Sequence, residues 1–242
     1  MTENIGKEKT HMSGIAKIQQ KRDDYRNGLG NTSSFTPGGK EVWLKDGDQM
    51  FFTSAGTGEP EDRYLEDYSM FTFRKDNRWA NVLNDENVDK SVVPDDVRPQ
   101  RKFALWVYVH EIIHTDKRNE EWEPVNGPGS KQLFKETIED FRIIPLGFGR
   151  SDYVWNQFAE IFEDWGSLNK GVIRIKRSGS GIDTSYSVTA TTRPLEVPED
   201  RLDEIDELQS IREYLQERYG GEKETVSAGA PYSEDEKIGD LF

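Results

Sequence analysis

Residues 101–113 carry the most regular apolar alternation of the chain, and this segment constrains the fold more than any other. Phe103, Leu105, Val107 and Val109 alternate with Lys102, Trp106, Tyr108 and His110. Successive side chains of a strand point to opposite faces of a sheet, so this period of two predicts a long β-strand with one face against a core. A chain built around such a strand is expected to be mainly β.

Turn residues and further apolar runs predict the other elements. Strands are expected at 42–45, 50–53, 69–75 and 141–145, and in a hairpin over 171–192 with a Ser-Gly-Ser-Gly turn. A short helix is expected at 131–139, a longer one from an N-cap at Ser151 to a stop at Gly166, and an amphipathic one at 199–219. About five strands with an intervening helix favour a five-stranded β-barrel with added helices over a βαβ sheet.

Charge is divided unevenly along the chain. The net charge is −14, but residues 196–242 alone hold 15 acidic and five basic side chains. Residues 168–195 hold five basic side chains against Asp183. The body is therefore locally basic and the acidity is concentrated after it, which fits either a nucleic-acid binder with an acidic appendage or an acidic interaction module that mimics DNA.

Composition and these boundaries predict the organisation and setting of the chain. We expect an N-terminal arm (1–40), a β domain (41–195), an amphipathic helical segment (196–221), and a spacer with a disordered acidic tail (222–242). The chain has no cysteine, which excludes disulfides and thiolate metal sites. No apolar run is long enough for a membrane span, so a cytoplasmic protein is expected.

The segment His110-Glu-Ile-Ile-His114 matches the H-E-x-x-H motif of zinc peptidases, with Glu136 in place as a third ligand and Glu111 as the base. The motif needs a helix, which brings residues four apart to about 6 Å. On a strand the same residues lie about 13 Å apart, too far for one zinc ion. The alternation before the motif predicts a strand, so no metal, cofactor or catalytic residue is expected, and a thermolysin-like peptidase is the alternative.

The strand prediction also provides a candidate surface for unpaired bases. If the odd-numbered residues of 103–109 are buried, Lys102, Trp106 and Tyr108 face outward, where rings stack on bases and cations contact phosphates. The same argument places Arg174 and Lys176 opposite a core in the 171–192 hairpin. The predicted DNA-binding residues are Trp43, Lys45, Arg74, Arg101, Lys102, Trp106, Tyr108, Arg174, Lys176, Arg177 and Tyr186.

The hairpin residues Ile173-Arg-Ile-Lys-Arg-Ser-Gly-Ser-Gly-Ile-Asp-Thr-Ser-Tyr-Ser-Val188 resemble the strand-turn-strand of phage-type single-stranded DNA-binding proteins. The end of the chain, Pro231-Tyr-Ser-Glu-Asp-Glu-Lys-Ile-Gly-Asp-Leu-Phe242, is similar to their acidic, Phe-terminated tails. The resemblance implies an OB-fold-like core that coats single-stranded DNA in replication, recombination and repair.

The same resemblance implies partners as well as a fold. It implies a tail that recruits a polymerase, helicase or primase through Asp240, Leu241 and Phe242, and self-association on DNA. The cysteine zinc site of some members does not carry over, because this chain has no cysteine.

Overall fold

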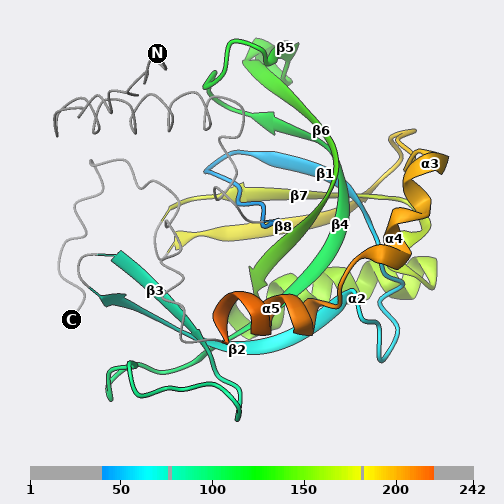
Figure 1. Ribbon diagram of the computed structural model, residues 1–242. Coiled ribbons are helices and arrows are strands. Elements are labelled where there is room, and N and C mark those ends of the chain that lie inside the picture. The colour runs from blue at the N-terminus through cyan, green and yellow to red at the C-terminus, as the bar shows by residue number, and fades with distance from the viewer. Residues whose placement is uncertain (1–39, 76–77, 181–182, 221–242) are drawn as a thin grey trace, which may run out of the picture. The chain divides into compact units, whose positions relative to one another are not determined.

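The computed structural model describes residues 40–75, 78–180 and 183–220, and their fold is mainly β, as predicted (Figure 1). The described strands are β1 (Gln49–Ser54), β2 (Leu65–Lys75), β3 (Arg78–Leu83), β4 (Gln100–His114), β5 (Glu123–Asn126), β6 (Gln132–Gly147), β7 (Val172–Ser178) and β8 (Ser185–Thr191). The helices are α2 (Tyr153–Trp165), α3 (Glu199–Leu202), α4 (Glu204–Glu207) and α5 (Ile211–Tyr219), with 3₁₀ turns at Pro128–Ser130, Arg150–Asp152 and Leu168–Lys170.

The strands form one open antiparallel sheet organised by β4. One edge of β4 pairs with β6 from Lys102 to His114. Its other edge pairs first with β2, over residues 100–105, and then with β1, over residues 107–113. Beyond these lie β3 on one side and β7 and β8 on the other, and β5 adds to β6. The predicted five-stranded barrel is therefore corrected to an open sheet of eight strands.

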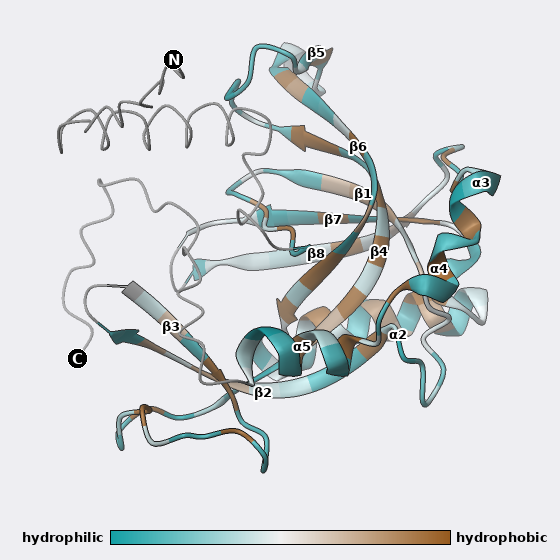
Figure 2. Ribbon diagram, in the orientation of Figure 1, coloured by the Kyte–Doolittle hydropathy of each residue, from teal (hydrophilic) through white to brown (hydrophobic). Residues whose placement is uncertain are grey.

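Both faces of β4 are buried, which explains why this strand is so apolar. The odd-numbered residues from Phe103 to Val109 pack with β1, β7 and the buried side of α2. The even-numbered residues Ala104, Trp106 and Tyr108 pack instead under α5. In Figure 1 the two helices lie on opposite sides of the lower part of β4, and Figure 2 shows the brown, hydrophobic stretches of β4 and β6 in that region.

The predicted helix at 131–139 is wrong, because these residues belong to the long strand β6. Lysine, glutamate and glutamine favour a helix locally, but pairing with β4 at residues 134–137 and with β5 at residues 132–135 holds this segment extended. The predicted strand at 141–145 is confirmed as the second half of β6. Strands β3 and β5 lie in segments that were expected to be loops.

Helix α2 ends where the sequence predicts and begins later. Gly166 adopts a left-handed conformation (φ 69°), and its backbone N–H donates to the carbonyl of Phe162. This is the usual glycine stop of a helix. Ser151 is not the N-cap: it lies in a 3₁₀ turn with φ 54°, and Asp152 precedes the first helical residue.

The predicted helix at 199–219 is divided into three pieces. Leu208 is extended (φ −64°, ψ 130°), which ends α4. Ser210 then starts α5 with a capping box, in which its side chain accepts from the N–H of Glu213 and the Glu213 carboxylate accepts from the N–H of Ser210. The break lets Ile211 and Leu215 pack onto the sheet.

Several predictions fall outside the described residues: the arm up to residue 39, the tail, and the partner-binding residues Asp240, Leu241 and Phe242. Among the residues that are described, no helix has both the length and the apolar composition to cross a membrane.

Candidate nucleic-acid interface

The strands β1, β7 and β8 have one face in the main core and a second face that carries most of their polar side chains, around a small buried apolar cluster of Phe51, Ile113, Leu133 and Val172. Met50, Ile173, Ile175 and Val188 are buried in the core. The residues between them point the other way, and register aligns them in two rows across the sheet. One row is Lys135, Ile113, Gln49, Lys176 and Ser187, and the next is Thr137, Glu111, Phe51, Arg174 and Thr189. We call these two rows, with Arg193, the basic face.

Arg174 and Lys176 are the two cations of the basic face that no carboxylate of the described residues neutralises. Within the described ranges neither side chain forms an ion pair, and Arg174 Nε donates to Thr189 Oγ1 at 3.2 Å. Lys176 is exposed. Their positive charges are thus available to an anion in solvent.

Arg193 and Lys135 extend the face but are partly neutralised. The Arg193 guanidinium lies 3.8 Å from the ring centroid of Phe51 and forms an ion pair with Glu111. Lys135 Nζ lies 2.6 Å from a carboxylate oxygen of Glu123, and this contact raises the pKa of the lysine. The face therefore holds four cations and the carboxylate of Glu111, and Glu123 on the neighbouring strand β5 pairs with Lys135.

The prediction that Trp106 and Tyr108 face solvent is wrong. Each is only 2% exposed, because α5 covers the face of β4 that carries them. Trp106 Nε1 donates to the carbonyl of Gln209 at 2.9 Å, and its ring meets Tyr214 edge-on at 6.4 Å. In this conformation neither ring is available to stack on a base.

Three predicted cations lie at the other end of β4, far from the basic face. Residues 101 and 111 are ten apart on one strand, which is roughly 33 Å. Arg101 pairs with Asp67 at 3.2 Å and lies over the Phe148 ring. Burial lowers the pKa of Lys102, and Arg74 lies 5.2 Å from the Trp79 ring in the β2–β3 hairpin. The structure does not bring these residues to the same site as Arg174 and Lys176.

The four remaining predicted residues lie near β1, β7 and β8, on the side of these strands that faces the core. Arg177 donates to the carbonyl of Leu44 and so holds the segment before β1. Burial, followed by the charge of Arg118, lowers the pKa of Lys45. Tyr186 packs against the core that contains Val188, and Trp43 is half-buried between two core residues. None of them belongs to the basic face.

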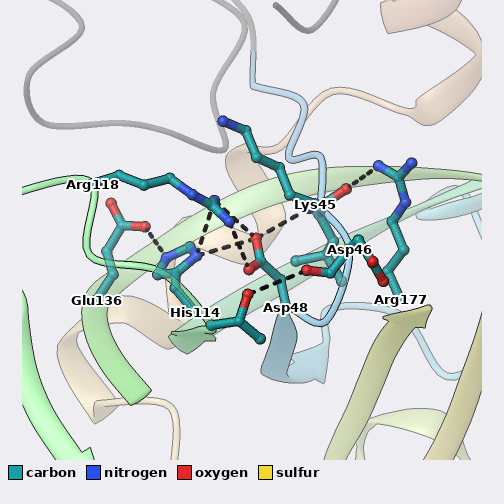
Figure 3. Close-up of polar contacts among 9 residues, drawn as sticks. Lys45, Asp46, Asp48, His114, Arg118, Glu136 and Arg177 are labelled. Carbon is teal, nitrogen blue, oxygen red and sulfur yellow. Dashed lines mark hydrogen bonds and ion pairs between the residues drawn. The ribbon is translucent and has the colours of Figure 1, made fainter. Parts of the chain in front are cut away.

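Asp48, His114, Arg118 and Glu136 form a buried charged network next to the turn at Asp46–Gly47 (Figure 3). The His114 ring is fully buried, with Nδ1 3.1 Å from Asp48 and Nε2 2.9 Å from Glu136. Arg118 adds two contacts of 3.2 Å to the Asp48 carboxylate. Trp122 stacks on His114 with ring centroids 3.9 Å apart. Carboxylates beside both ring nitrogens favour a proton on each nitrogen, and so they favour the imidazolium form of His114.

The pKa values of this network follow from its geometry. Burial disfavours the charge on His114, but hydrogen bonds to Asp48 and Glu136 outweigh it and raise the pKa of the imidazole. Burial likewise opposes the charge of Asp48, and contacts with His114 and Arg118 lower the pKa of that carboxyl. His110 behaves in the opposite way, because burial lowers its pKa to about 4.

The H-E-x-x-H segment lies on a strand, as predicted, and its histidines have separate partners. His110 Nε2 contacts Thr53 Oγ1 at 2.9 Å, whereas His114 lies between Asp48 and Glu136. The carboxylates flank the His114 ring from opposite sides and do not converge on one point. In the described ranges no group of three His, Asp or Glu side chains is placed to hold a metal ion.

Sequence reasoning missed Phe51, Lys135 and Gln49 as members of the face. Lys135 was hidden by the wrong helix prediction, and Gln49 precedes the expected strand at 50–53. Arg193 was visible in the basic segment 168–195 but has no pattern that places it over Phe51. Comparisons with models of known protein families and with curated proteins find no match for this chain.

Proposed function

We propose that this chain binds single-stranded DNA, largely independently of sequence, on the basic face. One observation carries the proposal: Arg174 and Lys176 lie two residues apart on the face of β7 that is turned away from the main core, with no carboxylate partner among the described residues. Both cations can contact a phosphate backbone, and each such contact releases counterions and so favours binding.

The register of the sheet supports a DNA strand that runs across the β-strands. Arg174 and Lys176 are two residues apart on β7, which is roughly 7 Å, and Arg193 and Lys135 continue the positive charge toward β4 and β6. Gln49 adds a hydrogen-bonding group between Lys135 and Lys176, and Ser187 and Thr189 add hydroxyl groups on β8 beyond Lys176 and Arg174. Relatedness of this sheet to the OB-fold is part of the proposal, since OB-folds are partly open barrels that bind oligonucleotides on a sheet face.

The acidic residues 231–242 are proposed to act in two ways. As a tethered polyanion, they compete with DNA for the basic face at high effective concentration. Asp240, Leu241 and Phe242 are proposed to bind a replication protein such as a polymerase, helicase or primase, and copies of the chain to associate along DNA. No catalytic residue is assigned in this proposal.

Replacing both Arg174 and Lys176 with glutamine should flatten the slope of log affinity against log salt concentration by about 1.4, at about 0.7 per charge on single-stranded DNA. Affinity at low salt should fall roughly tenfold, as measured by fluorescence anisotropy with oligo-dT. Arg98→Gln is the matched control, because this exposed cation lies in the loop before β4 and should leave the slope unchanged. Equal slopes for the double variant and the control would refute the proposed face.

Deleting residues 231–242 should raise affinity for oligo-dT, most strongly at low salt. The deletion removes the four carboxylates Glu234, Asp235, Glu236 and Asp240, which compete with phosphate for the basic face. The gain should shrink toward zero as salt screens the competition, and it should be absent in the Arg174→Gln/Lys176→Gln background. A salt-independent gain, or the same gain in that background, would show that the tail does not act at this face.

A further inference from the structure

A cavity of about 240 Å³ opens at the end of β1, next to the basic face. Three segments that are distant in sequence form it: the end of β1 with Thr53, the loop around Lys170 before β7, and the chain from Leu195 to Ile205. Leu195 is two residues beyond Arg193, and Thr53 is two residues beyond Phe51. A strand of nucleic acid that follows Lys176, Arg174 and Arg193 therefore arrives at this cavity.

The walls of the cavity combine flat apolar surface with polar groups. Val197, Leu202 and Ile205 supply apolar surface, and Leu202 is 46% exposed. Asn169 accepts from Ser167 Oγ through its side-chain oxygen at 2.6 Å, so its NH₂ group retains its donors. Glu196 adds an exposed carboxylate that forms no ion pair within the described residues. Such a mixture of apolar walls and a few polar groups is typical of small-molecule sites.

Lys170 gives the cavity a cation beside these walls. Its ammonium donates to the carbonyl of Trp165 at 2.6 Å, at the end of α2. This contact fixes the long side chain and leaves the ammonium with further protons to donate. A phosphate next to a base in the cavity would meet this charge.

We propose that this cavity receives one base of the DNA strand bound on the basic face, and that it prefers cytosine to thymine. The Glu196 carboxylate accepts from the exocyclic amine of cytosine, which thymine lacks, while Asn169 donates to a ring acceptor. The apolar residues contact the faces of the base, and Lys170 contacts its phosphate. The inference rests on the proposed function and adds a base-selective site to a surface that is otherwise independent of sequence.

The test compares oligo-dC and oligo-dT of equal length, titrated into the full chain and followed by anisotropy. The wild type should bind oligo-dC about fivefold more tightly, and Glu196→Gln should remove this preference. Val197→Phe with Leu202→Phe should also remove it, because the larger side chains fill the space. Val92→Phe is the control, since Val92 is exposed in the loop before β4 and does not line the cavity. Thermal melting of each variant confirms that it is folded.

The possible outcomes separate this inference from the proposed function. Loss of the dC preference in both cavity variants, with an unchanged salt slope, supports the base site. Equal binding of dC and dT by the wild type, or an unchanged preference in both variants, overturns the base site and leaves the basic face standing. If the wild type binds neither oligonucleotide, the proposed function fails and the base site fails with it.

Discussion

Replacing His114 with leucine should lower the free energy of unfolding by about 3–5 kcal/mol, because it leaves two buried carboxylates without their shared cation. Asp48 is fully buried and Glu136 nearly so, and His114 contacts both. Arg118 still contacts Asp48 in the variant, but Glu136 loses its partner on the ring. Urea denaturation followed by circular dichroism measures the loss.

His110→Leu is the matched control for this prediction. His110 lies four residues earlier on the same strand and is also buried, but it is neutral and makes one hydrogen bond, to Thr53. Its loss should cost only about 1 kcal/mol. Similar costs for the two variants would show that His114 is not a buried cation between two carboxylates.

The two buried histidines make stability depend on pH, with a maximum near pH 6.5. The folded pKa of His114 is raised, so its contribution is complete below the unfolded value of 6.5 and is lost as pH rises through the folded pKa. The folded pKa of His110 is about 4, so the unfolded chain alone takes up its proton as pH falls from 6.5 toward 4, and stability falls there too. His114→Leu should therefore remove the decline on the alkaline side and keep the acid one.

The local sequence pattern was sufficient to predict those elements whose tertiary contacts agree with their local preference. The alternation in β4, the pairing of β7 with β8 as a hairpin, and Gly166 after α2 each express a preference that the tertiary structure keeps. The opposition of Arg174 and Lys176 to Ile173 and Ile175 also follows from strand period alone. These elements could be predicted because no distant contact competes with the local signal.

The rest depended on contacts between segments far apart in the chain. Residues 132–139 have helix-favouring composition, and their pairing with β4 and β5 makes them a strand. The alternation correctly places Trp106 and Val107 on opposite faces of β4. It contains no information on α5, which lies about a hundred residues later and covers the face that carries Trp106. For the same reason the pairing of His114 with Asp48 has no local signature, since 66 positions separate them.

Replacing Trp106 with alanine should destabilise the fold by about 3–5 kcal/mol, because a large buried ring under α5 is lost and leaves a cavity. The Gln209 carbonyl would also lose the donor that now bonds to it at 2.9 Å. The folded Trp106→Ala protein should bind oligo-dT with unchanged affinity, because the ring is inaccessible to bases in the wild type.

Trp106→Phe separates this structural role from a role in binding. Phenylalanine keeps most of the packing against Tyr214 and loses the indole hydrogen bond, so the expected cost is about 1–3 kcal/mol and the variant stays folded. Its affinity for oligo-dT should equal that of the wild type when both are titrated well below their melting temperatures. A tenfold weaker affinity in a fully folded Trp106→Phe protein would mean that DNA reaches the face of β4 under α5, and would require this helix to leave the sheet when DNA binds.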